Sequence, residues 1–399
     1  MTVQFTRNYK ILVLISITLS RAVYALNWYT LSPGLAQVSR DFALSSTSLG
    51  ILESAFLAGA GIFQLPSTLA SSRWGAKSLC VGGMLLIALS NILAGLTGSF
   101  TELIFLRFTL GIGASMFFAP TIALVGNLFR NERQGLALGI YNSAFSVGGS
   151  VALFGWAYID SLFGWREGLI IGAVLAAALG IENLIVIRHS SKDPLTETKT
   201  LAQAKGVLKN KQIWLLSVGI IGLWAGYYVA GQFIPFYEET VKLVSPSTSS
   251  FLAAQLLLWP VVGSIVGGYL SDRLQNRKLF MLIPTIAFGA SICFLGITNL
   301  PESFALVISL GVMDSFIFAA MYASPYQMAE LNNNQKIISI SLMNSVQISG
   351  AFIGPIVFSL VEETSPVLSW VAVGIFVLVF TPALALAKEP FARKKVSVA

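Results

Sequence analysis

The apolar stretch VAVGIFVLVFTPALAL, residues 371–386, decides the class of fold, and ILVLISITL, residues 11–19, has the same character near the other end of the chain. Neither contains a charged residue, and neither alternates between apolar and polar positions. Strands of a membrane barrel alternate in this way, whereas a helix in lipid is apolar along its length and satisfies its own backbone hydrogen bonds. These stretches therefore predict membrane-spanning helices.

Composition excludes several classes of protein. The chain has 399 residues, of which 55% are hydrophobic and 11% are charged, and its mean hydropathy is +0.77. Soluble domains carry about 25% charged residues, so this chain has too little charge to cover a surface that faces water. We therefore exclude a soluble enzyme, a nucleic-acid-binding protein and a disordered scaffold.

Apolar runs between charge clusters and turn residues predict an all-α membrane protein with twelve transmembrane helices, because each span needs about 20 mostly apolar residues. The predicted spans are residues 9–37, 47–70, 78–98, 102–127, 134–159, 166–187, 213–237, 248–271, 279–299, 303–328, 337–361 and 367–387. The first is too long for a signal-peptide core and no small-residue cleavage site follows it, so we expect it to be retained.

Basic residues predict the orientation. With the N-terminus inside, most of the 25 Lys and Arg residues fall in cytoplasmic loops, and only Arg40, Arg166 and Lys242 fall in outer ones. Because cytoplasmic loops of membrane proteins are enriched in Lys and Arg, we expect a multi-pass protein of the cell membrane with both termini cytoplasmic. The net charge of +7 is then a topology signal and indicates no nucleic-acid partner.

Cysteine and histidine are scarce. Cys80 and Cys293 fall in or beside separate spans, and the one histidine, His189, lies in the central loop. Two thiols make no disulfide framework, and a metal site of His and Cys is not expected. The chain also lacks a Walker loop, so transport driven by ATP is not expected. We predict no cofactor, no metal site, no catalytic residues and no enzymatic activity.

The two halves of the chain resemble each other. The polar residues 188–212 separate six predicted spans from six more, which gives an N-terminal bundle (1–188), a cytoplasmic connecting loop (189–212) and a C-terminal bundle (213–399). QLPSTLASSRWGAK (64–77) is matched by GGYLSDRLQNRK (267–278), and Asn142-Ser143 is matched by Asn344-Ser345. Two pseudo-symmetric six-helix bundles around a central cavity are the architecture of a rocker-type secondary transporter.

These motifs resemble the major facilitator superfamily over essentially the whole chain. The loop at 64–77 is similar to the family's G-x-x-x-D-R-x-G-R-K signature, and the preceding Q-x-P is found in many organic-anion and nitrate-type members, mostly prokaryotic. RFTLGIGA (107–114) is similar to the family's R-x-x-x-G-x-G-A stretch. The resemblance implies alternating access, with the first, fourth, seventh and tenth spans lining the cavity.

The resemblance also implies a gate on the cytoplasmic face, in which the signature aspartate pairs across the two halves. The gating residues it implies are Arg73, Lys77, Asp272, Arg273 and Arg277. The first copy of the motif has Ser72 in place of the aspartate and Thr68 in place of the glycine. A serine carries no negative charge, so we expect this half of the gate to be weaker.

Ionisable residues inside spans are costly in lipid and are therefore the first functional candidates. Arg21 is followed by Tyr24 and Trp28 on the same helical face, and a guanidinium with aromatic neighbours suits a carboxylate or another oxyanion. The alternative is an ion pair of Arg21 with Asp314 or Glu53. Arg107 is predicted as a lesser candidate for substrate binding, since the family arginine there is often structural or assists proton release.

Two carboxylates are candidates for proton coupling. Asp314 lies near the middle of its span and is predicted either to take up and release a proton or to form a fixed ion pair. Glu53 lies nearer the outer face and is the second candidate.

Polar and aromatic residues complete the predicted site. The seventh span carries Trp224, Tyr227, Tyr228 and Gln232 at helical spacing, which favours cavity lining over an interface belt. The predicted substrate-binding residues are Arg21, Tyr24, Trp28, Arg107, Trp224, Tyr227, Tyr228, Gln232, Asp314, Tyr322 and Asn344.

The sequence thus predicts a monomeric secondary active transporter of a small organic solute, expected to be an anion moved together with protons as in a symporter. One alternative is efflux of lipophilic compounds by the same fold, because aromatic residues line the predicted cavity. Another is a nutrient sensor that does not cycle, because Ser72 replaces the family aspartate. The partners expected are a small-molecule substrate, protons and the lipid bilayer.

Overall fold

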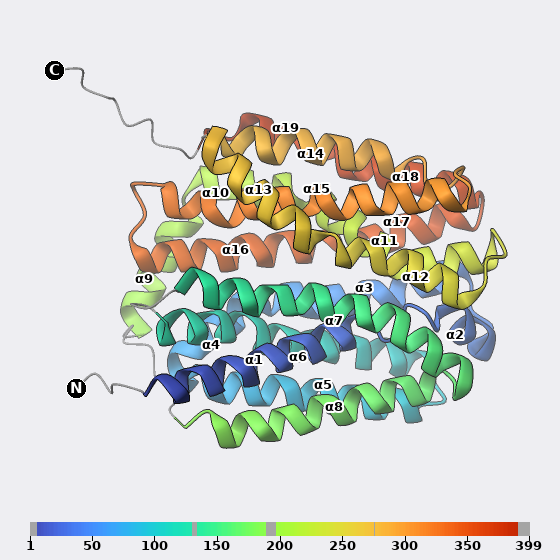
Figure 1. Ribbon diagram of the computed structural model, residues 1–399, viewed down its shortest axis with the longest axis horizontal. Coiled ribbons are helices and arrows are strands. Elements are labelled where there is room, and N and C mark those ends of the chain that lie inside the picture. Colours follow the sequence, from blue (N-terminus) through green and yellow to red (C-terminus); the bar gives the residue numbers. More distant parts are fainter. Residues whose placement is uncertain (1–5, 130–133, 189–196, 275, 390–399) are drawn as a thin grey trace.

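The computed structural model describes residues 6–129, 134–188, 197–274 and 276–389, and every regular element in these ranges is a helix (Figure 1). The helices are α1 (Arg7–Trp28), α2 (Leu35–Phe42), α3 (Ser46–Ile62), α4 (Gln64–Trp74), α5 (Ala76–Leu96), α6 (Phe100–Leu128), α7 (Gln134–Leu162), α8 (Trp165–Val186), α9 (Glu197–Leu208), α10 (Lys211–Gly219), α11 (Ile221–Thr240), α12 (Pro246–Leu258), α13 (Pro260–Leu274), α14 (Arg277–Ile292), α15 (Leu300–Gln327), α16 (Asn333–Ala351), α17 (Ile353–Glu362), α18 (Pro366–Val379) and α19 (Thr381–Leu386).

Local sequence explains where the helices begin. The side chains of Ser45 and Ser245 accept hydrogen bonds from backbone N–H groups in the first turns of α3 and α12. Asn299 forms a capping box with Glu302 at the start of α15, and Asn332 forms one with Gln335 at the start of α16. Such side chains satisfy backbone donors that the first turn of a helix leaves unpaired.

Most predicted spans are helices long enough to cross a bilayer. Within the described ranges, nine helices or nearly continuous helix pairs are long and apolar enough to cross a bilayer. Helices α2 and α3 together are also long and apolar enough, as a bent pair. The two remaining predicted spans correspond to α14 and to α12–α13, which is interrupted at Trp259 because α13 begins at Pro260, whose nitrogen cannot donate to the preceding turn. Every predicted span thus has its helix or helix pair, and the all-α prediction is confirmed.

The first span is shorter than predicted. We expected it to cover residues 9–37, but α1 ends at Trp28, and α2 is a separate helix at 120° to α3. The sequence Pro33-Gly34 lies in the break, and Gly34 caps α2. Helix α2 is held beside the start of α8, where the Gln37 side chain bonds the backbones of Asp160 and Trp165.

Helices α1–α8 form one bundle and α10–α19 form the other, and they meet along the middle of the molecule (Figure 1). The start of α1 and helix α9 lie at one end, and α2 lies at the opposite end. Gln212 at the start of α10 bonds the backbone of Lys388, so the end of the described chain is also near α9. We call the end with α9 the terminal side and the end with α2 the far side.

The bundles pack closely on the far side. Helix α3 packs on α16 and α17, and α7 packs on α12. Glycine permits this approach: a Cβ on Gly50 would lie 2.6 Å from the carbonyl oxygen of Pro355, and one on Gly61 would lie 2.3 Å from the nitrogen of Ser349. Any larger side chain at these positions would force the bundles apart.

Candidate substrate cavity

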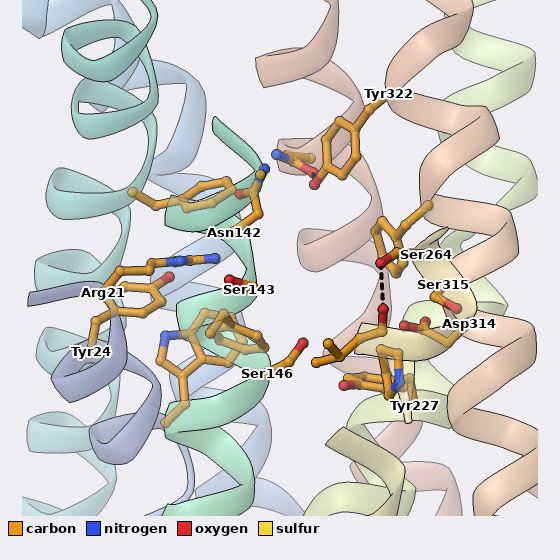
Figure 2. Close-up of a pocket in the computed structure, with 18 of the residues that line it drawn as sticks. Arg21, Tyr24, Asn142, Ser143, Ser146, Tyr227, Ser264, Asp314, Ser315 and Tyr322 are labelled. Atoms are coloured by element: carbon orange, nitrogen blue, oxygen red, sulfur yellow. Dashed lines mark hydrogen bonds between the residues drawn. The ribbon is translucent and has the colours of Figure 1, made fainter. Parts of the chain in front are cut away.

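A cavity of about 730 Å³ lies between the bundles (Figure 2). It is lined by Arg21, Tyr24, Trp28, Phe118, Leu136, Gly139, Ile140, Asn142, Ser143, Phe145, Ser146, Trp224, Tyr227, Pro260, Val261, Ser264, Asp314, Ser315, Phe318, Tyr322, Asn344 and Ile348. These residues come from both bundles: α1, α6 and α7 supply one wall, and α11, α13, α15 and α16 supply the other. The volume is that of a pocket for a small organic molecule.

Arg21 projects from α1 into the cavity (Figure 2). Its guanidinium carbon lies 4.5 Å from the ring centre of Tyr24, 4.4 Å from that of Phe118 and 4.7 Å from that of Phe145. Rings at this distance attract a cation but accept no strong hydrogen bond from its N–H groups. Nε and Nη1 are buried and bond to none of the described residues. These two nitrogens of Arg21 therefore have no acceptor in the described part of the chain.

The predicted alternative, an ion pair of Arg21 with Asp314 or Glu53, is absent from the described part of the chain. Asp314 projects from α15 on the opposite wall (Figure 2), is 5% exposed, and has its buried Oδ1 without a hydrogen-bond partner among the described residues. Burial without a partner is unfavourable for a charged group. The cavity thus holds a cation on one wall and a carboxyl group on the other, and neither is paired with an opposite charge among the described residues.

Arg107 and Glu53 form a buried ion pair away from the cavity lining. Arg107 Nη2 on α6 lies 2.6 Å from Glu53 Oε2 on α3, and the side chains are 1% and 0% exposed. Tyr228 on α11 donates its hydroxyl to the same carboxylate oxygen over 2.7 Å. The Glu53 carboxylate therefore neutralises Arg107 within one bundle and bonds the other bundle.

The cavity brings together most of the predicted substrate-binding residues. Those that line it are Arg21, Tyr24, Trp28, Trp224, Tyr227, Asp314, Tyr322 and Asn344. Arg107, Tyr228 and Gln232 are not among its lining residues. Gln232 instead donates from Nε2 to the carbonyl oxygen of Trp28 over 3.0 Å, so it joins the bundles beside the cavity. Glu53 is also outside the lining, which leaves Asp314 as the coupling candidate that reaches the cavity.

Sequence reasoning missed the polar wall on α7 and α13. Asn142, Ser143 and Ser146 line the cavity from α7, and Ser264 lines it from α13 (Figure 2). The internal repeat held the signal, because Asn142 matches Asn344, which was predicted to bind substrate. Asn344 Oδ1 accepts from the Tyr322 hydroxyl over 2.9 Å.

Hydrogen bonds join the two bundles on the far side of the cavity. The Ser32 hydroxyl donates to the carbonyl oxygens of Gly231 and Gln232 over 2.9 and 3.0 Å. The Thr47 N–H, at the start of α3, donates to Glu363 Oε1 over 2.9 Å. This bond lowers the pKa of the Glu363 carboxyl below its ordinary value, so the contact keeps its charge at neutral pH.

The predicted gating residues lie on the terminal side. Arg73 lies in the last turn of α4 and is exposed, as is Arg273 on α13. Arg277, at the start of α14, is buried. The backbone N–H groups of Arg277 and Lys278 donate to the Glu389 carboxylate. Lys77 is half-buried on α5, and the side chain of Asp272 lies outside the described residues. The Ser72 hydroxyl donates to Leu69 of its own helix over 2.7 Å.

Two apolar helical bundles enclose a largely apolar cavity that carries a few polar side chains, which is the architecture expected of a membrane transporter. The sequence matches the family profile of the Major Facilitator Superfamily over residues 17–257 and 243–398, and the chain belongs to this family. It is thus a multi-pass membrane protein of a family of transporters rather than enzymes.

Curated relatives include several transporters of anions. The chain is 24% identical over 61% of its length to a probable L-galactonate transporter of Escherichia coli and 22% identical over 64% to a nitrite extrusion protein of Bacillus subtilis. These alignments span 58% and 64% of the relatives' own lengths. A hexuronate transporter of Bacillus subtilis is 21% identical over 87% of this chain and 86% of its own.

Solved structures share the fold. A bacterial homologue of the human lysosomal transporter Spinster, in an inward-facing and unoccupied conformation, superposes with a TM-score of 0.79 and 16% identity, covering 97% of this chain and 98% of that one. The same homologue in an occupied conformation gives a TM-score of 0.77. At this identity the likeness concerns the fold alone.

Proposed function

We propose that the protein is a secondary active transporter that binds a small organic anion in the central cavity and carries it across the cytoplasmic membrane together with protons. The observation that carries this proposal is the Arg21 guanidinium, which lines the cavity without an anionic partner in the described part of the chain. A buried cation without a counter-ion is unfavourable, so binding of an anion beside it lowers the free energy. The anions named for the relatives support the same class of substrate.

The contacts between the bundles support alternating access. Inter-bundle hydrogen bonds at Ser32, Thr47 and Tyr228 lie beside and beyond the cavity on the far side, and toward the terminal side α4 packs on α16. Lining residues extend along α7 to Leu136, near its start, and along α15 to Tyr322, near its end, both in the direction of the terminal side. If the termini lie in the cytoplasm, as the basic loops predict, the bundles are joined on the outer side and the cavity lining extends toward the cytoplasm.

Asp314 supplies the proposed coupling to protons. Its carboxyl group lies in the same cavity as Arg21, without a cation bonded to it among the described residues. Protonation removes the cost of a buried negative charge and leaves the Arg21 cation to the substrate. The same proton is released when access alternates and Asp314 meets the other solution.

Uptake into proteoliposomes tests the function. Purified protein should accumulate an organic anion from an acidic outer solution, and one pH unit of gradient should increase accumulation about tenfold for each proton moved. Uptake that does not depend on the pH gradient would contradict the coupling to protons. Competition by a lipophilic cation, with no competition by carboxylates, would favour efflux of lipophilic compounds. Binding of an anion without transport would favour the sensor.

The variant Asp314→Asn separates coupling from binding. An amide has nearly the shape of the carboxyl group but exchanges no proton, so acceleration by the pH gradient should be lost while exchange of labelled for unlabelled anion continues. Both rates are measured in the same proteoliposomes. Glu330→Gln, which changes an exposed carboxylate after α15, is the control and should keep both activities. A full response of Asp314→Asn to the gradient would contradict the assignment.

A further inference from the structure

Among the described residues that line it, the cavity combines one cation, Arg21, with a wall of aromatic rings. Resting on the transport function proposed above, we infer that the substrate is a monocarboxylate with a flat or bulky apolar body, of the type of an arylalkanoate. Inorganic anions, dicarboxylates and polyhydroxylated sugar acids fit the same cavity less well. Charge, the aromatic wall and the volume of the cavity support this class.

Charge limits the substrate to one carboxylate. Among the described lining residues, Arg21 is the one cation. The other arginine inside the N-terminal bundle, Arg107, is neutralised by Glu53 at 2.6 Å. A dicarboxylate would bring its second negative charge into a cavity with no second cation and with Asp314 on the opposite wall. A buried charge without a partner opposes binding strongly.

An aromatic wall continues from the cation across the cavity. Trp28 on α1 lies 6.3 Å from Trp224 on α11 between ring centres, and Trp224 lies 5.4 Å from Phe318 on α15. Phe318 in turn stacks on Tyr322 at 5.7 Å. Aromatic surfaces of this kind bind apolar and especially flat groups, by area and by offset or edge contacts. A carboxylate at Arg21 would place the body of the substrate against this wall.

Several hydroxyls of the lining already donate within the protein, whereas the indole N–H groups of Trp28 and Trp224 are buried without a partner among the described residues. The hydroxyls of Ser143, Ser264 and Ser315 donate to carbonyl oxygens three residues earlier in their own helices, over 2.9, 3.0 and 2.7 Å. The Tyr322 hydroxyl donates to Asn344. Each hydroxyl of a sugar acid left without a partner would weaken binding by about tenfold.

Inorganic anions are too small to fill the cavity. The cavity measures about 730 Å³, which suits an organic molecule of many heavy atoms. An inorganic anion at Arg21 would leave most of the apolar wall in contact with water, and burial of that wall would then contribute nothing to affinity.

A matched panel of ligands tests the inference on the unmodified protein. Phenylacetate, galactonate, nitrate and phenylacetamide are compared as thermal stabilisers and as competitors of labelled phenylacetate uptake. We expect phenylacetate to bind at least about tenfold more tightly than galactonate or nitrate, and phenylacetamide, which lacks the charge, to bind at least about tenfold more weakly than phenylacetate.

Variants of the wall add a second readout. Trp224→Ala should weaken binding of phenylacetate about tenfold while changing that of galactonate little, because only the aryl group uses the ring. Phe105→Ala, on the exposed face of α6, is the control and should change neither. Tighter binding of galactonate that depends on Arg21 would overturn the inference and leave the proposed function in place, whereas tighter binding of nitrate would overturn the inference and the organic nature of the proposed substrate. If the protein neither bound nor transported any anion of the panel, both the inferred substrate class and the proposed function would be refuted.

Discussion

Replacing Arg21 with glutamine should raise the KM for the transported anion by about 10- to 100-fold. A hydrogen bond to a charged group contributes about 1.5–3 kcal/mol, and each 1.4 kcal/mol is about a factor of ten in affinity. Nε and Nη1 of Arg21 are buried without partners among the described residues, so the substrate carboxylate is the group expected to satisfy them. Initial rates of uptake against anion concentration give the KM.

Thermal stability of the empty protein distinguishes a binding role from a structural one. If Arg21 served mainly to hold the bundle together, its loss would lower the melting temperature. As a buried cation without an ion pair in the described chain, it instead costs stability when the site is empty. We therefore expect Arg21→Gln to melt no lower than the unmodified protein and to lose the stabilisation that the ligand gives.

Two further variants sharpen this test. Arg21→Lys keeps the charge but not the planar fork of donors, so its KM should fall between those of glutamine and arginine. Arg40→Gln removes an exposed arginine at the end of α2 and should leave uptake unchanged. An unchanged KM in Arg21→Gln would refute the anion site.

The class of fold was predictable because the bilayer imposes it. Spans such as residues 371–386 carry their signal in the sequence alone, since every lipid-facing position must be apolar. Where a span ends was less predictable. The end of α1 at Trp28 depends on how α2 bonds Asp160 and Trp165 of distant helices, and no local pattern records that contact.

The ionisable candidates could be singled out from the sequence, but their pairing could not. Rarity of charge in lipid singled out Arg21, Glu53, Arg107 and Asp314. Which of them form pairs depends on the angle at which each side chain leaves its helix and on the packing of α3 against α6, which one sequence does not contain. In the structure Glu53 pairs with Arg107 and therefore does not pair with Arg21.

Removing the Glu53 carboxylate should have the largest effect on stability. Glu53→Gln leaves Arg107 buried at 1% exposure without a counter-ion, and breaking such a pair from one side costs about 3–5 kcal/mol. The double variant Glu53→Gln with Arg107→Gln removes both charges and should recover much of the loss. Melting temperatures of the single and double variants measure this. Equal losses in Glu53→Gln and in the double variant would contradict the pairing.

Tyr228→Phe tests the second bond of Glu53 without disturbing the ion pair. The lost hydrogen bond joins α11 of one bundle to α3 of the other, so only the arrangement with a closed far side is weakened. A bond to a charged group contributes about 1.5–3 kcal/mol, which would shift the population toward an open far side by about tenfold or more. Tyr158→Phe, exposed on α7, is the control.

Distances between spin labels measure that shift. Cysteines replace the exposed Ser45, before α3, and Thr364, after α17, in a chain whose Cys80 and Cys293 are changed to alanine. Tyr228→Phe should enlarge the population with the longer separation, and the control should not. The Glu53 carboxylate bonds Arg107 of its own bundle and Tyr228 of the other bundle through the same oxygen. We therefore assign Glu53 to the contact between the bundles, and the proposed coupling to protons rests on Asp314. An unchanged distance distribution in Tyr228→Phe would break this division of roles.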